Sequence, residues 1–273
     1  MVNIAIFRNP GVKISHRTNI LAEELIKRQH KISHIEDDIV YSGYDVMIID
    51  YVGPIESAID RGKRARTKVI LMDGKEEHAS MVDLSISPYV NPKAQYRGSD
   101  YCVVFKKGRT TYHRPDKKKK VAFVSVGDFD ETDMTEFALD ILAEMNLNAI
   151  VTKSSNHGNL KDKYSRIEVY DEDNYYDAMH ECVIGIISAD DIMLQALYYG
   201  LPCIIMPQNK KQKLGIELMQ HCCVPCKRDS GEVKFWIEYL LGNEGFRKNL
   251  SILSSYHIDG KGCARICDLI EQL

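Results

Sequence analysis

The chain has 273 residues, of which 44% are hydrophobic and 27% are charged, with a net charge of −3. This composition is ordinary for a globular protein, and the weak negative charge gives no overall attraction to nucleic acid or to an anionic membrane. A chain of this length predicts two domains, since domains usually run to roughly 100–200 residues.

The N-terminal apolar run is too short for a signal peptide because it ends at Arg8. No stretch approaches the roughly 18 apolar residues that a membrane span requires. We therefore expect a cytoplasmic protein without a membrane span.

The eight cysteines are expected to be reduced thiols, because no secretion signal accompanies them. The segment 221–226 is the one cluster with metal-like spacing, and Cys263 and Cys267 are candidates for a second ligand pair. Buried apolar thiols are the preferred interpretation. We expect no metal and no cofactor.

Predicted strands and helices alternate from the N-terminus. The apolar run 2–7 predicts a strand, a turn signal follows at 9–11, and the apolar period around Leu21 and Leu25 predicts a helix. Further strands are predicted at the segments 31–35, 44–49, 68–72 and 83–87. Strands that alternate with helices predict a parallel sheet with right-handed crossovers.

Four consecutive lysines, Lys117–Lys120, mark a predicted domain boundary. The strand–loop–helix pattern then restarts, with a helix at 133–145 and strands at 121–126, 149–152, 167–170, 183–187 and 203–206. We expect an N-terminal domain over 1–116 and a C-terminal domain over 117–273, whose last helix is a candidate to pack back on the N-terminal domain. Tandem α/β domains usually hold a ligand in the cleft between them, beyond the carboxyl ends of the strands.

Two loops of the predicted C-terminal domain carry the residues suited to a nucleotide. Gly127 precedes a helix start, where backbone amides can bind phosphate. Thr132 or Asp133 is expected to cap this helix. The neighbouring carboxylates oppose direct contact with phosphate. Ser188 ends a strand, and Gln195 on the following helix can bond a ribose hydroxyl. A plain capped helix is the alternative for the first loop.

The segment 186–209 has a strand-end serine, an amide before Ala-Leu, Gly-x-Pro, a strand and Gln-Asn. It resembles the donor-nucleotide half of glycosyltransferase-B proteins. More narrowly, it resembles the family of the UDP-sugar hydrolase of pseudaminic acid biosynthesis and its spore-coat polysaccharide relatives. Stretches 17–22, 44–51, 93–98 and 259–265 agree with that family in the same order along the chain.

The resemblance implies an α/β fold of glycosyltransferase-B architecture, with two Rossmann-like domains, an interdomain cleft and a UDP-sugar as substrate. Two positions depart from the family pattern. Ile14 stands where the family has its loop histidine, and His16 lies two places later; Gln195 stands at the ribose-binding glutamate. Both changes favour a divergent transferase over a hydrolase.

The candidate site residues fall into three groups. The catalytic candidates are His16, Asp50 and Arg17; the donor-binding candidates are Gly127, Asp128, Ser188, Ala189, Leu194, Gln195, Gln208 and Asn209; the acceptor-side candidates are Asp73, Tyr89, Lys93 and Tyr96. Histidine or aspartate can take a proton from an acceptor hydroxyl, and arginine can bind phosphate through two bonds. Turn or helix capping is the alternative for the aspartates, and packing is the alternative for the tyrosines.

The expected function is therefore transfer of a sugar from a nucleotide donor, with UDP as the expected nucleotide, to a glycan, a metabolite or a modified nucleic-acid base. The alternatives are hydrolysis of the same donor and non-catalytic binding of a nucleotide sugar. Lys106, Lys107, Arg109 and Lys117–Lys120 are the only basic run that favours a nucleic-acid acceptor.

Overall fold

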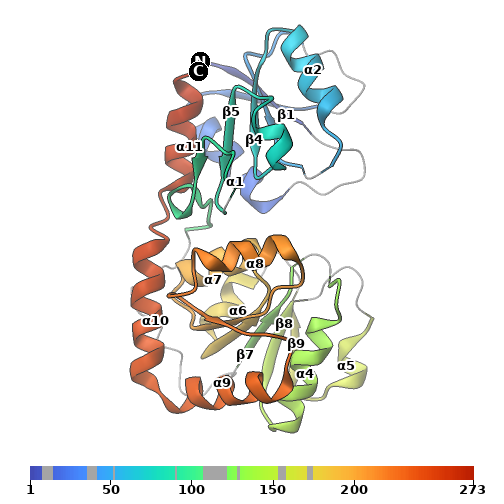
Figure 1. The fold of residues 1–273 in the computed structure, drawn as a ribbon, viewed down its shortest axis with the longest axis vertical. Coiled ribbons are helices and arrows are strands. Elements are labelled where there is room, and N and C mark those ends of the chain that lie inside the picture. The colour runs from blue at the N-terminus through green and yellow to red at the C-terminus, as the bar shows by residue number, and fades with distance from the viewer. Residues whose placement is uncertain are drawn as a thin grey trace. The chain divides into compact units, whose positions relative to one another are not determined.

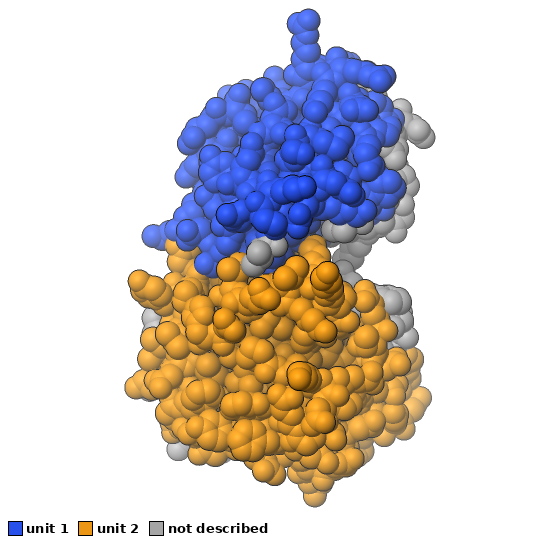
Figure 2. Space-filling model, in the orientation of Figure 1, with its two compact units in different colours: residues 1–105, 260–273 blue, residues 106–259 orange. Residues whose placement is uncertain are grey.

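The computed structural model describes residues 1–7, 15–35, 42–51, 53–89, 91–106, 122–127, 130–152, 158–170 and 175–273. The chain divides into two compact units (Figure 2). Unit 1 comprises 1–105 and 260–273, and unit 2 comprises 106–259. The boundary sequence Lys117–Lys120 lies outside the described residues.

Unit 1 is built on a parallel sheet of six strands in the order β2-β1-β3-β4-β5-β6. The strands are β1 (Asn3–Phe7), β2 (Lys31–Ile35), β3 (Val46–Ile49), β4 (Lys68–Met72), β5 (Leu84–Ser87) and β6 (Tyr96–Arg97). The predicted strands of this half are confirmed to within two residues at each end. Strands β3 and β4 are short, mainly apolar runs, and β3 and β5 are buried throughout, as expected of a parallel sheet covered by helices.

Helices cover both faces of the unit 1 sheet. The helices are α1 (His16–Lys27), α2 (Glu56–Arg64), α3 (Glu76–Ala79), a 3₁₀ turn at Ser99–Tyr101 and α11 (Gly262–Glu271). Alternate residues along the strands, such as Ile48 and Met47, point to opposite cores. Helices α1 and α11 contribute to the first core, and α2 contributes to the second.

Helix α11 packs against α1 and the 3₁₀ turn, although it is the last helix of the chain (Figure 1). A Cβ atom at Gly262 would lie 2.2 Å from the carbonyl oxygen of Cys102, so the first turn of α11 needs glycine to approach that backbone. Arg265 donates to the carbonyl of Asp100 at 3.0 Å. These two contacts give a physical reason for the Gly-x-x-Arg spacing in the C-terminal segment.

Unit 2 has a second parallel sheet, in the order β12-β11-β10-β7-β8-β9. Its strands are β7 (Ala122–Ser125), β8 (Ala149–Thr152), β9 (Ile167–Tyr170), β10 (Ile184–Ile187), β11 (Cys203–Ile205) and β12 (Val224–Pro225). Five of these were predicted from apolar runs, whereas β12 has only two residues and is too short to give such a signal.

The helices of unit 2 are α4 (Met134–Glu144), α5 (Leu160–Lys163), α6 (Tyr175–His180), α7 (Asp191–Tyr198), α8 (Lys210–Glu217), α9 (Ser230–Gly242) and α10 (Glu244–His257). Helices α4 and α9 pack on one face of the sheet around Val124 and Ile186. Helix α7 contacts β10 and β11. Within the described residues, no helix is both long enough and apolar enough to cross a membrane.

Candidate functional site

The polar residues of unit 1 gather at the carboxyl edge of its sheet. Asp50 directly follows β3, and Asp73 directly follows β4. The N-terminal turn of α1 reaches the same edge and supplies Ser15, Arg17 and Thr18. In open parallel sheets this edge is where ligands bind. We call these five residues the unit 1 cluster.

Asp50 accepts hydrogen bonds from three other residues of the unit 1 cluster. Its Oδ2 atom accepts from Ser15 Oγ at 2.5 Å, from Arg17 Nε at 2.9 Å and from the hydroxyl of Thr18. Its Oδ1 atom accepts a second bond from the Arg17 guanidinium. The Asp50 side chain is only 5% exposed, so the arginine neutralises a buried carboxylate through a bidentate contact.

Arg17 also reaches the second carboxylate. Its Nη1 atom lies 3.6 Å from Asp73 Oδ2, and Ser87 Oγ donates to Asp73 Oδ1 at 3.0 Å. Asp73 adopts a left-handed backbone conformation with φ of 52°. The positively charged guanidinium of Arg17 therefore contacts two buried carboxylates. With both carboxylates ionised, the three groups carry a net charge of one negative unit.

The cluster makes Asp50 a weak base. Burial alone would raise the pKa of Asp50, but the Arg17 charge and the hydrogen bonds from Arg17, Ser15 and Thr18 outweigh burial and hold this pKa below its ordinary value. A general base works best with a pKa near the working pH. The predicted role of Asp50 as proton acceptor is therefore poorly matched to its surroundings, which instead suit it to holding Arg17 in place.

The lowered pKa of Asp50 predicts a specific acid sensitivity. A carboxylate with a depressed folded pKa stabilises the protein above its unfolded pKa of about 3.9, and this stabilisation is lost as pH falls through the folded pKa. We expect the unfolding temperature of the wild type to fall steeply below about pH 4 and that of Asp50→Asn to fall less steeply. Thermal unfolding from neutral to acid pH tests this. Asp60→Asn, an exposed change on α2, should follow the wild-type slope.

The other predicted residues of unit 1 lie in different surroundings. His16 is the first residue of α1 and is half-buried. Tyr89 is 8% exposed, as expected from the alternative that this tyrosine packs in the interior. Lys93 is exposed, and Tyr96 is exposed with its ring edge-to-face against Tyr101 at 5.6 Å. Among the predicted site residues that the structure describes in unit 1, His16 and Asp73 are the other possible proton acceptors near Arg17 in sequence or space.

Unit 2 also gathers polar side chains at the carboxyl edge of its sheet. Thr152 Oγ1 donates to Ser125 Oγ at 2.5 Å, and the Ser188 amide donates to the carbonyl of Ser125. Ser188 Oγ donates to Asp190 Oδ2 at 2.6 Å, and Asp190 caps α7 by accepting from the Ile192 amide. Asp190 was not predicted as a site residue, although an aspartate before a helical run is an N-cap signal.

Gly127 lies against this aspartate. It has φ of 83°, and a Cβ atom there would lie 2.4 Å from Asp190 Oδ2. The glycine is therefore required both by its backbone conformation and by the close approach of the carboxylate. Asp128, the neighbouring predicted donor residue, lies outside the described residues.

We expect Gly127→Ala to lower the free energy of unfolding by about 1–3 kcal/mol, because it adds left-handed strain and a clash. Gly158→Ala is the matched control, since a Cβ atom there has no neighbour within 4 Å. Urea unfolding of both variants measures the difference. Equal stability of the two would contradict the close contact with Asp190.

Gln208 and Asn209 perform structural roles in this edge. Gln208 Nε2 donates to the carbonyl of Val126 at 3.1 Å, and Gln208 Oε1 accepts from the Glu131 amide at 2.8 Å. The side chain thus joins the loop after β11 to the loop after β7. Asn209 caps α8 by accepting from the Gln212 amide at 3.0 Å.

The start of α4 differs from the prediction. Neither Thr132 nor Asp133 caps this helix through its side chain. Asp130, which is 2% exposed, accepts from the amides of Met134 and Thr135, both at 2.8 Å. A buried carboxylate reaches these amides because the chain turns through the left-handed residue Asp133. The amides expected to face a phosphate are therefore occupied by the protein itself.

The remaining predicted donor residues are buried. Ala189 is 3% exposed, Leu194 is 2% exposed and Gln195 is 4% exposed. Ala189 and Leu194 thus belong to the packed interior around α7. Gln195 is on the second turn of α7, and a ribose would need a local rearrangement to contact its amide.

No protein-family model matches the sequence, and a search of curated proteins finds no match. Solved structures do match over nearly the whole chain. MurG of Acinetobacter baumannii has a TM-score of 0.74 at 10% identity, covering 100% of both chains. The glycotransferase of kitacinnamycin has a TM-score of 0.70 at 13% identity, covering 99% of this chain and 98% of that chain. UDP-GlcNAc 2-epimerase from Neisseria meningitidis, bound to UDP-GlcNAc, has a TM-score of 0.67 at 7% identity, covering 100% of both chains.

The two units are the Rossmann-like domains of a glycosyltransferase-B fold. The predicted fold class is thereby confirmed. At these identities the likeness shows the fold alone. None of the three structures is the hydrolase of pseudaminic acid biosynthesis, so that narrower resemblance stays a prediction.

Proposed function

We propose that the protein transfers a sugar from a nucleotide donor, with UDP as the preferred nucleotide, to an acceptor hydroxyl. The observation that carries this proposal is the likeness of both units, over the whole chain, to a glycotransferase and to a protein bound to UDP-GlcNAc. The polar residues at the carboxyl edges of the two sheets support it, because this edge is the usual ligand site of such folds.

The charges at three helix starts of unit 2 favour one place for the donor diphosphate. The start of α4 is filled by the Asp130 carboxylate, and that of α7 by the Asp190 carboxylate. The start of α8 has the neutral cap Asn209 and the exposed Lys210 and Lys211. Backbone amides and lysines favour an anion, whereas the carboxylates oppose it. We therefore assign the diphosphate to the start of α8.

The acceptor would be activated in unit 1. In this scheme Asp73 takes the proton of the acceptor hydroxyl, and the hydroxyl oxygen forms a bond to the anomeric carbon of the sugar. The bond between that carbon and the diphosphate oxygen breaks, and the electron pair leaves with the nucleoside diphosphate. Lys210 and Lys211 stabilise the charge that develops on the leaving group. Asp50 acts as a positioning residue by holding Arg17 between the two carboxylates.

The test is a binding panel followed by a turnover assay. UDP, GDP, CMP, TDP and UDP-GlcNAc are each added to the purified protein, and the unfolding temperature is measured. A ligand at 100 times its dissociation constant adds about 2.7 kcal/mol of stability. We expect UDP and UDP-GlcNAc to raise the unfolding temperature, and Lys210→Glu/Lys211→Glu to abolish the rise. Lys248→Glu on α10 is the control for replacing an exposed lysine by glutamate away from the start of α8.

The turnover assay separates the proposed transferase from the two alternatives. UDP release that requires an added acceptor supports transfer. UDP release into water alone supports hydrolysis. Tight binding without UDP release under either condition supports a non-catalytic binder. The absence of a shift with all five nucleotides would overturn the nucleotide-sugar proposal itself.

A further inference from the structure

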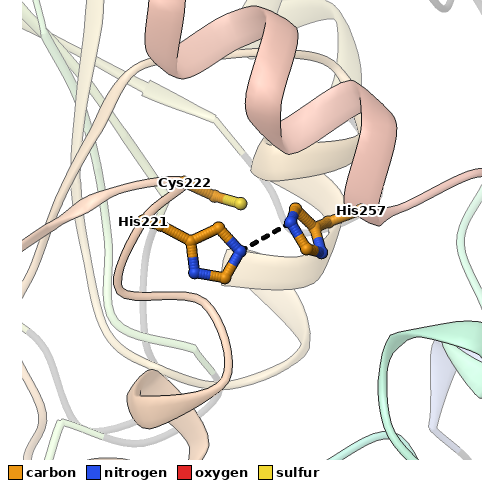
Figure 3. Close-up of side chains that lie close together, drawn as sticks. All are labelled: His221, Cys222 and His257. Carbon is orange, nitrogen blue, oxygen red and sulfur yellow. Dashed lines mark hydrogen bonds between the residues drawn. The ribbon is translucent and has the colours of Figure 1, made fainter.

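Two histidines and a cysteine of unit 2 converge at a place that the proposed reaction does not use. His221 and Cys222 lie in the turn after α8, and His257 is the last residue of α10 (Figure 3). Their ligand atoms all lie within 4.8 Å of one another. His221 is exposed, His257 is half-buried and Cys222 is fully buried. We call these three residues the His–Cys–His cluster.

The cluster lies at the opposite edge of the sheet from the donor residues. Cys222 comes two residues before β12, which runs parallel to β11, so the cluster is at the amino edge. Ser188 and Gln208 follow β10 and β11 and therefore lie at the carboxyl edge. A ligand at the cluster would not take part in sugar transfer.

The donor set suits a borderline-soft metal ion. Imidazole nitrogen and thiolate sulfur are the common ligands of Zn²⁺, at about 2.0–2.1 Å and about 2.3 Å respectively. Ligand atoms around a tetrahedral ion at those distances are separated by roughly 3.3–3.7 Å, which follows from the bond lengths. The ligand atoms of His221, Cys222 and His257 lie within 4.8 Å of one another, so small side-chain rotations would bring them to these separations.

The two imidazoles already face each other. His221 Nε2 lies 2.6 Å from His257 Nε2, and the Cys222 thiol points toward the space beside them (Figure 3). In the absence of a metal, the N–H of one ring donates a hydrogen bond to the nitrogen of the other. A metal ion would replace that shared proton and the thiol proton, and the nitrogen atoms would move apart by roughly 0.7 Å to reach the spacing of a tetrahedral site.

We propose that His221, Cys222 and His257 bind a zinc ion through three protein ligands, with water completing the tetrahedron. The ion joins the end of α10 to the turn before β12. His257 lies two residues before Asp259, the last residue of unit 2. The ion therefore fixes the point where the chain leaves unit 2 and continues into α11. This proposal departs from the sequence-based expectation of no metal.

The test uses the full chain, first as purified and then stripped with a chelator. We expect elemental analysis to find about one zinc per chain, and zinc to raise the unfolding temperature of the stripped protein. Cobalt(II), added to the stripped protein, should give the visible absorption of a tetrahedral site and a thiolate charge-transfer band. His221→Ala should fold normally because His221 is exposed, and it should weaken cobalt binding by more than about tenfold.

Cys222→Ser should remove the thiolate band. Cys223→Ser is the matched control: it is the next residue, it is also buried, and its thiol donates to the carbonyl of Met219. It should keep both the band and the affinity. The proposal is overturned if the wild type binds neither zinc nor cobalt, or if His221→Ala and Cys223→Ser bind cobalt equally well.

Discussion

Replacing Arg17 by methionine should lower the free energy of unfolding by about 3–5 kcal/mol, because it removes the charge that neutralises a buried carboxylate. The Asp50 and Asp73 side chains are 5% and 7% exposed, so water does not replace the lost guanidinium. Both buried carboxylates would then lack the positive charge that lies beside them. Urea unfolding of Arg17→Met measures the loss.

The double variant Arg17→Met/Asp50→Asn should recover part of this stability, because it removes the unpaired charge as well. An asparagine at position 50 can still accept from Ser15 and Thr18. Lys68→Met is the control in the same unit, since Lys68 is half-exposed where it pairs with Asp83, and surface pairs contribute about 1 kcal/mol or less. Equal losses of stability for Arg17→Met and Lys68→Met would show that the buried ion pairs of Arg17 contribute no more than a surface ion pair.

Replacing Asp73 by asparagine should reduce kcat by about 10²–10⁴-fold, because a general base contributes rate enhancement of that order. Asparagine is nearly the same size and tolerates the left-handed conformation that Asp73 adopts. The fold of the loop should therefore survive. The affinity for UDP should be unchanged, since the proposed donor residues belong to unit 2.

Asp83→Asn supplies the comparison for Asp73→Asn. Asp83 directly precedes β5 and so lies at the amino edge of the same sheet, where it accepts from the Val69 amide. Its variant should keep kcat near the wild-type value. If Asp73→Asn retains wild-type turnover and the pH–rate profile keeps its acidic limb, the proton acceptor is another group, and His16→Ala becomes the next variant to measure.

Much of the strand framework was predictable because buried parallel strands are short apolar runs. Strands β2, β4, β8 and β9 have the bounds that the sequence predicted. Helices α9 and α10 received no prediction. The large apolar residues of α9 are spread over more than one face, with Phe235 56% exposed, so its amphipathic period is weak.

The site was predictable only in part, for two physical reasons. Residues that follow strands, such as Asp50 and Asp73, are brought to one edge by the parallel topology, and the sequence could place them there. Whether each aspartate can accept a proton depends on which side chains contact its oxygen atoms. The Arg17 contacts with Asp50 and Asp73 depend on side-chain geometry, which the sequence does not give. His221 and His257 are 36 residues apart, and nothing in the local pattern indicates that they meet.

The chain order of unit 1 has a consequence for synthesis. A protein grows from its N-terminus and its domains generally fold as they emerge from the ribosome. Unit 2 is one continuous segment, whereas unit 1 needs α11, whose Ile266, Cys267 and Ile270 belong to its core. The N-terminal segment of unit 1 is therefore made before unit 2, and its apolar core is complete only after α11 has followed unit 2.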